Sequence, residues 1–129
     1  MASQPATILC VDDEEPGLKV RRILLESAGY NVLTASSGRE GIKLFEAEKV
    51  DAVILDYWMS GLNGVATARE LKRIKQTVPI VILSAYGTIL DEMLGVADVW
   101  IRKGEEDPEY LLEVLAKLIK GVSTVKEPT

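Results

Sequence analysis

Five short runs of apolar residues are spaced along the chain and separated by polar or turn-forming residues. They span Thr7 to Val11, Asn31 to Ala35, Ala52 to Asp56, Pro79 to Ala85 and Asp98 to Lys103. Several are nearly continuous in Ile, Val and Leu and do not alternate with polar residues. This pattern is typical of strands that are buried on both faces of a parallel sheet.

The segments between these runs carry apolar residues at helical spacing. Pro16 can begin the first helix and Gly29 can end it, because proline suits a first turn and glycine a helix end. This segment carries Leu18, Ile23, Leu24 and Leu25. Further helices are predicted over Gly41–Lys49, Val65–Gln76, Ile89–Val96 and Pro108–Gly121. The alternation of strands and helices predicts a three-layer, doubly wound α/β fold.

Length and composition indicate one ordinary domain with a substantial core. The chain has 129 residues, of which 47% are hydrophobic, and its formal net charge is −5. Its densest basic cluster is Lys19, Arg21 and Arg22, which is too short to follow a phosphate backbone. We therefore expect no nucleic-acid binding by this domain.

Several functional classes are disfavoured by residues that the chain lacks. With no histidine and a single cysteine, Cys10, it offers neither the usual zinc ligands nor a Ser–His or Cys–His pair. The opening MASQPAT does not resemble a signal peptide, and no apolar segment is long enough to span a membrane. A cytoplasmic protein without membrane insertion is expected.

Polar residues recur where the predicted strands end: Asp12 and Asp13, Asp56, Ser84, and Lys103. Taken singly, each has a plainer interpretation as a helix cap, a turn residue or a solvated charge. Parallel strands, however, bring these ends to one edge of the sheet, where α/β proteins bind ligands. Two carboxylates ~5 Å apart repel by roughly 3 kcal/mol at an effective dielectric constant of ~20. Mg²⁺ would relieve this repulsion, and one carboxylate could then attack phosphorus.

The chain resembles the receiver domains of two-component response regulators, and among them single-domain chemotaxis regulators. The similarity rests on ILCVDDEE, VILDYWMSGLNG, PIVILSAYG and DVWIRK, which occur in the expected order and spacing. It implies a flavodoxin-like (βα)5 fold with strand order 2-1-3-4-5. Residues 1–121 would form the receiver domain and residues 122–129 a loose tail.

The resemblance also implies roles for the acidic residues. Asp56 matches the phosphoacceptor. Asp12 and Asp13 match the pair that holds Mg²⁺ together with Asp56, and the backbone carbonyl of Trp58 matches a further ligand.

Three further residues acquire roles from the resemblance. Ser84 matches the hydroxyl residue that turns toward the phosphoryl group, Lys103 the lysine that contacts it, and Trp100 the aromatic switch position. The rings of Trp58 and Tyr86 flank the site and are predicted to slow attack by water on the acyl phosphate.

A receiver domain is a phosphoacceptor signalling protein and not a conventional enzyme. The resemblance implies a sensor histidine kinase or histidine phosphotransfer protein as donor. It also implies a separate downstream effector, because no output domain follows in this sequence, and a monomer or weak dimer. Three departures from the family pattern are Ser60, Gly104 after Lys103, and a segment between Ser84 and Lys103 that is short by about one helical turn.

Three alternatives remain open at this stage. A haloacid dehalogenase-type phosphatase also uses a strand-end aspartate, but it needs a second acid where this chain has Trp58. A flavodoxin-like flavin carrier needs a phosphate-binding loop where this chain has the acidic DDEEPG. A receiver-like module that acts by binding alone, without phosphorylation, is the third.

Overall fold

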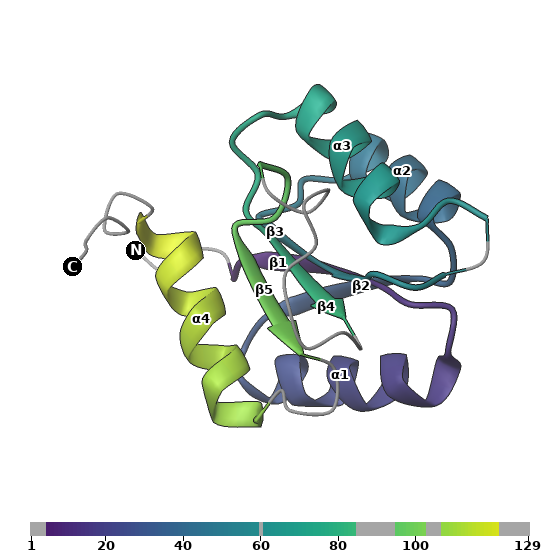
Figure 1. Cartoon of the computed structure of the whole chain (residues 1–129). Coiled ribbons are helices and arrows are strands. Elements are labelled where there is room, and N and C mark those ends of the chain that lie inside the picture. Colours follow the sequence, from purple (N-terminus) through teal and green to yellow (C-terminus); the bar gives the residue numbers. More distant parts are fainter. Residues whose placement is uncertain (1–4, 60, 85–94, 103–106, 122–129) are drawn as a thin grey trace.

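The computed structural model describes residues 5–59, 61–84, 95–102 and 107–121 (Figure 1). The strands of the described part are β1 (Thr7–Val11), β2 (Asn31–Ala35), β3 (Ala52–Asp56), β4 (Ile80–Ser84) and β5 (Val99–Arg102). Its helices are α1 (Glu15–Ser27), α2 (Gly38–Ala47), α3 (Gly64–Ile74) and α4 (Pro108–Gly121). All neighbouring strands pair in parallel in the order β2-β1-β3-β4-β5, which confirms the predicted fold class and strand order.

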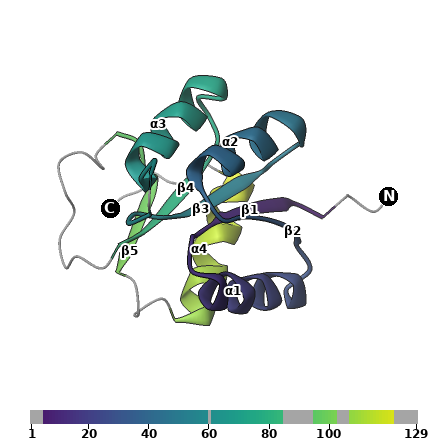
Figure 2. The same cartoon turned by 90° about the vertical axis from the view of Figure 1, so that its right-hand side faces the viewer.

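The sheet is covered on both faces, as its continuous apolar strands require. Helices α1 and α4 lie on one face and α2 and α3 on the other (Figures 1 and 2). Successive strand residues point to opposite faces. Leu9 and Val11 accordingly pack into the core beneath α2 and α3, whereas Ile8 and Cys10 pack into the core beneath α1 and α4.

Strand register brings the candidate site residues to one edge. Asp56 pairs with Leu83, and Ser84 pairs with Arg102 one position further along. Because every strand runs in the same direction, the carboxyl ends of β1, β3 and β4 meet at this edge. The predicted convergence of the strand ends is therefore confirmed for the described strands.

Helix α2 begins at Gly38, three residues before the predicted start at Gly41. Ser37 caps the helix, because its hydroxyl oxygen accepts a hydrogen bond from the Glu40 amide at 3.1 Å. The Glu40 carboxylate in turn accepts the Ser36 amide at 2.8 Å. This reciprocal arrangement satisfies the Glu40 amide in the first turn and the Ser36 amide just before the cap residue.

The buried face of α1 differs from the apolar residues picked out in the sequence. Leu18, Arg21 and Leu25 are buried, whereas Ile23 is 65% exposed. Residues at positions i, i+3 and i+7 share one face of a helix, and this geometry places Arg21 between two core leucines. The helix ends before Gly29, whose φ of +98° suits glycine.

Some predictions fall on residues outside the described ranges. These are Lys103, Tyr86, Ser60, Gly104, the tail 122–129 and residues 89–94 of the predicted helix Ile89–Val96. The last two residues of that predicted helix, Gly95 and Val96, are described and form a turn. Within the described part, no helix is both long enough and apolar enough to cross a membrane.

Candidate functional site

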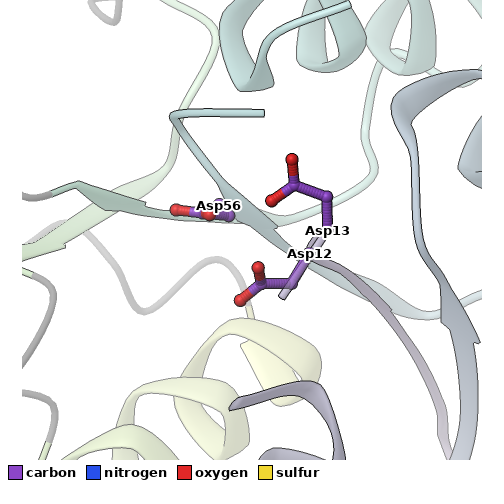
Figure 3. A group of neighbouring side chains, drawn as sticks. All are labelled: Asp12, Asp13 and Asp56. Carbon is purple, nitrogen blue, oxygen red and sulfur yellow. The ribbon is translucent and has the colours of Figure 1, made fainter. Parts of the chain in front are cut away.

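Three carboxylates gather at the carboxyl edge of the sheet. Asp12 and Asp13 follow β1, and Asp56 is the last residue of β3 (Figure 3). One oxygen from each lies within 4.8 Å of the others. Asp12 and Asp56 are buried, whereas Asp13 is exposed. The group therefore combines two desolvated carboxylates with one that reaches solvent.

Backbone and side-chain contacts fix Asp12 firmly. Its amide donates to the carbonyl of Ala35 at 3.1 Å and so extends the pairing of β1 with β2. Its Oδ1 accepts the Glu14 amide at 2.9 Å, and its Oδ2 accepts Nη1 of Arg21 at 3.2 Å. Buried carboxylates need such partners, because desolvation strongly disfavours an uncompensated charge.

The backbone around Asp56 is held by the two elements that flank it. The next residue, Tyr57, donates its amide to the carbonyl of Leu83 at 2.8 Å, which extends the pairing with β4. The carbonyl of Tyr57 accepts the Gly64 amide at 2.9 Å, so the loop returns to the strand end at the start of α3. Asn63 caps that helix by accepting the Ala66 amide at 2.9 Å. The carboxylate of Asp56 thus stands on a constrained strand end.

Ser84 and the two tryptophans occupy different environments. Ser84 is fully buried at the end of β4, on the same edge as the carboxylates. The Trp58 side chain is 69% exposed, and its ring centroid lies 6.0 Å from that of Tyr57. Trp100 lies within β5, partly buried against the core beneath α2 and α3. Its buried indole nitrogen has no hydrogen-bond acceptor among the described residues.

Arg21 lies next to this site, whereas the sequence shows it only as part of the densest basic cluster of the chain. It approaches Asp12 from α1, and the Arg21 and Asp12 side chains are 7% and 0% exposed. One signal could have found it. Arg21 has the helical spacing of Leu18 and Leu25, so it belongs on the face that packs against the strand leading to Asp12.

The donor set fits a hard divalent cation. Asp12, Asp13 and Asp56 offer carboxylate oxygens only. Oxygen ligands with several negative charges suit Mg²⁺ better than softer transition metals. The residues present therefore meet the chemical requirement for the predicted magnesium site.

Comparison with known families decides the class of the protein. The family model described as the response regulator receiver domain matches residues 8–103. The chain belongs to this family. Receiver domains are phosphoacceptor signalling domains of two-component systems that bind Mg²⁺ at an acidic site. The family assignment sets aside the phosphatase and flavin-carrier alternatives.

Curated relatives of this receiver domain are longer response regulators. The transcriptional regulatory protein GlrR of Escherichia coli (strain K12) is 41% identical over 91 residues, which are 70% of this chain and 20% of that protein. CpxR of Klebsiella pneumoniae is 36% identical over 114 residues, which are 86% of this chain and 48% of that protein. The chain thus spans from one fifth to about half of their length.

Solved receiver structures share the fold over most of this chain. The chemotaxis protein CheY4 of Vibrio cholerae aligns with a TM-score of 0.82 at 28% identity, covering 88% of this chain and 98% of that one. The response regulator TrrA of Thermotoga maritima, solved in complex with Mg²⁺ and BeF, aligns with a TM-score of 0.80 at 33% identity and the same coverage.

Proposed function

We propose that this receiver domain accepts a phosphoryl group on Asp56 from a sensor histidine kinase or a histidine phosphotransfer protein. The observation that carries the proposal is the burial of Asp56 at a strand end, with oxygens of Asp12 and Asp13 within 4.8 Å. A buried carboxylate beside two others is costly for a purely structural residue. It is well suited to a nucleophile whose charge is neutralised during the reaction.

In the proposed reaction, a carboxylate oxygen of Asp56 attacks the phosphorus of the donor phosphohistidine. A new O–P bond forms while the P–N bond breaks, and its electron pair returns to the imidazole nitrogen. Asp12, Asp13, Asp56 and the Trp58 carbonyl would hold Mg²⁺, which supplies positive charge to the phosphoryl oxygens. The fixed backbone of Tyr57 keeps the attacking carboxylate oriented toward the edge of the sheet.

The proposed response to phosphorylation involves Ser84, Lys103 and Trp100. Ser84 stands at the end of β4 and would donate its hydroxyl to the phosphoryl group, with Lys103 contacting the same group. The rearrangement would move Trp100 and change the surface that a downstream effector recognises. The exposed ring of Trp58, together with Tyr86, would limit attack by water on the acyl phosphate.

Acetyl phosphate with Mg²⁺ tests the assignment without a kinase. We expect the wild-type protein to gain one phosphoryl group, measured by intact mass spectrometry, and Asp56→Asn to remain folded and gain none. Asp51→Asn is a matched control, because Asp51 stands just before β3 at its opposite end and its side chain accepts the Thr7 amide. This control should label like the wild type. Full labelling of Asp56→Asn would refute the nucleophile, and an unlabelled wild type would favour a module that acts by binding alone.

A further inference from the structure

The ion pair between Arg21 and Asp12 joins a charged residue on a core face of α1 to the acidic site. The guanidinium Nη1 lies 3.2 Å from Oδ2 of Asp12, and both side chains are almost completely buried. A buried ion pair is weak evidence for stability, because desolvating two charges offsets much of their attraction. Its position beside the carboxylate cluster therefore calls for a functional explanation.

The first turns of α1 are shaped to admit this pair. Helical side chains tilt toward the amino terminus, so the Arg21 side chain extends over the preceding turn, where Gly17 stands. A Cβ atom at Gly17 would lie 3.7 Å from Asp12 Oδ2 and 3.8 Å from Arg21 Nη2. Both distances are ordinary van der Waals contacts, so alanine would fit, whereas a side chain longer than alanine would compete for the space that the guanidinium and carboxylate now fill.

Charge decides how the pair affects the site. Asp12, Asp13 and Asp56 together carry three negative charges, and Arg21 contributes one positive charge that is fixed in the fold. This charge compensates the buried Asp12 when no metal is bound. The same charge repels a divalent cation that approaches the same carboxylates, and burial leaves the repulsion poorly screened by salt.

We propose that Arg21 is a built-in counter-ion of Asp12, which stabilises the metal-free site and in return weakens Mg²⁺ binding. The inference rests on the magnesium site of the proposed function. Arg21 is a positioning residue here, since it acts through Asp12 and not on the phosphoryl group. By linkage, a group that stabilises the metal-free form selectively must lower metal affinity by the same free energy.

The test is the Mg²⁺ dissociation constant of the full chain, measured by calorimetric titration at constant ionic strength. Arg21→Met keeps an unbranched side chain of similar length and removes the charge. We expect it to bind Mg²⁺ about tenfold more tightly, a change that corresponds to about 1.4 kcal/mol. Its melting temperature without metal should fall, and the rise in melting temperature on adding Mg²⁺ should exceed that of the wild type.

Two matched variants separate the effect of the Arg21 charge beside Asp12 from the general effects of a mutation or of a change in net charge. Arg21→Lys keeps the charge and should bind Mg²⁺ nearly as the wild type does. Arg22→Met removes the same charge from the next residue, which is exposed and pairs with Glu26 on the surface at 3.1 Å. We expect little change in its Mg²⁺ affinity. If Arg21→Met does not fold with or without Mg²⁺, Arg21→Gln replaces it, and the same tighter binding is expected.

Different results would overturn the counter-ion role of Arg21 and the metal site of the proposed function. Unchanged or weaker Mg²⁺ binding by Arg21→Met and Arg21→Gln, with wild-type binding intact, would overturn the counter-ion role alone. A loss of stability in these variants that is equal with and without Mg²⁺ would also overturn the counter-ion role. Absence of Mg²⁺ binding by the wild type would overturn the metal site itself and this inference with it.

Discussion

At the scale of single residues, Cys10 carries a thiol that lies close to the acidic site in sequence and is buried in the core. Its thiol is fully buried near the carboxyl end of β1, two residues before Asp12. Burial raises the pKa of the Cys10 thiol from 9.0 to about 12; Arg21 opposes this increase and Asp12 adds to it. The thiol therefore stays protonated in the folded protein at neutral pH, and Cys10 serves as a small apolar core residue.

This pKa predicts a specific loss of stability in alkaline solution. Above pH 9 the thiol of the unfolded chain releases its proton while the folded protein keeps it until about pH 12. The free energy of unfolding should thus fall as pH rises from 9, by at most about 1.4 kcal/mol per pH unit from this group. Denaturant unfolding of wild type and Cys10→Ala between pH 8 and pH 10.5 measures the difference. Parallel pH profiles for the two proteins would contradict the prediction.

At the scale of elements, the start of α3 packs directly on the end of β3. A Cβ atom on Gly64 would lie 2.6 Å from the carbonyl oxygen of Asp56 and 2.8 Å from Cα of Tyr57. Both neighbours are backbone atoms, so they cannot rotate away as a side chain could. The close approach of this helix to the strand therefore requires glycine.

Gly64→Ala should destabilise the protein by about 1–3 kcal/mol, because overpacking forces the backbone to shift. Since that backbone carries Asp56, labelling by acetyl phosphate should also slow. Gly17→Ala is a suitable control for stability only: its Cβ would make only ordinary contacts, and alanine favours a helix by up to about 1 kcal/mol over glycine. Chemical denaturation and labelling rates measure both effects. Wild-type stability in Gly64→Ala would show that α3 can move away from β3 at no cost.

Elements were predictable from the sequence where one local pattern determined them. Strands β1, β2 and β3 have the predicted bounds, because continuous apolar runs between turn residues have few other solutions. The start of α2 was placed too late, because the serine cap outside the apolar pattern decides where it begins. Ser37 and Glu40 carry the cap chemistry, which hydrophobic periodicity does not register.

Part of the candidate site was also predictable from the sequence. Topology alone places Asp12, Asp13 and Asp56 at one edge once the strands are parallel, and the described structure brings them together. Arg21 was not predicted as a member, because its burial depends on how α1 packs against β1. A local charge pattern favours solvent for an arginine next to another arginine. The spacing of Arg21 with Leu18 and Leu25 places it on the packed face of α1, and the tertiary contact with Asp12 supplies the partner for its charge.

At the scale of the whole molecule, charge and apolar packing are separated. The two apolar cores lie on the two faces of the sheet, whereas the three carboxylates gather at one edge. The cores stabilise the fold with or without phosphate or metal. Mutual repulsion at the edge opposes this stability in the metal-free protein. Changes in stability caused by metal or phosphate should therefore arise from the carboxylates at this edge.

Asp13 is suited to test whether repulsion among the carboxylates opposes stability, because it is the exposed member of the group Asp12, Asp13 and Asp56. Asp13→Asn removes one charge while keeping side-chain size, so it should relieve repulsion toward Asp12 and Asp56. Exposed charges interact by about 0–1 kcal/mol, so we expect the metal-free melting temperature to stay equal or rise slightly. The rise in melting temperature caused by Mg²⁺ should largely disappear, because the site then has one charged ligand fewer.

Thermal unfolding with and without Mg²⁺ measures both effects, and Asp51→Asn again supplies a carboxylate-to-amide control at the opposite end of β3. That control should retain the full Mg²⁺-dependent increase in melting temperature, since Asp51 accepts the Thr7 amide far from the cluster. A large drop in the metal-free melting temperature of Asp13→Asn would instead identify Asp13 as a structural residue of the loop before α1. The acidic edge would then be stabilised by contacts within that loop, and repulsion among its carboxylates would not govern how the domain responds to Mg²⁺.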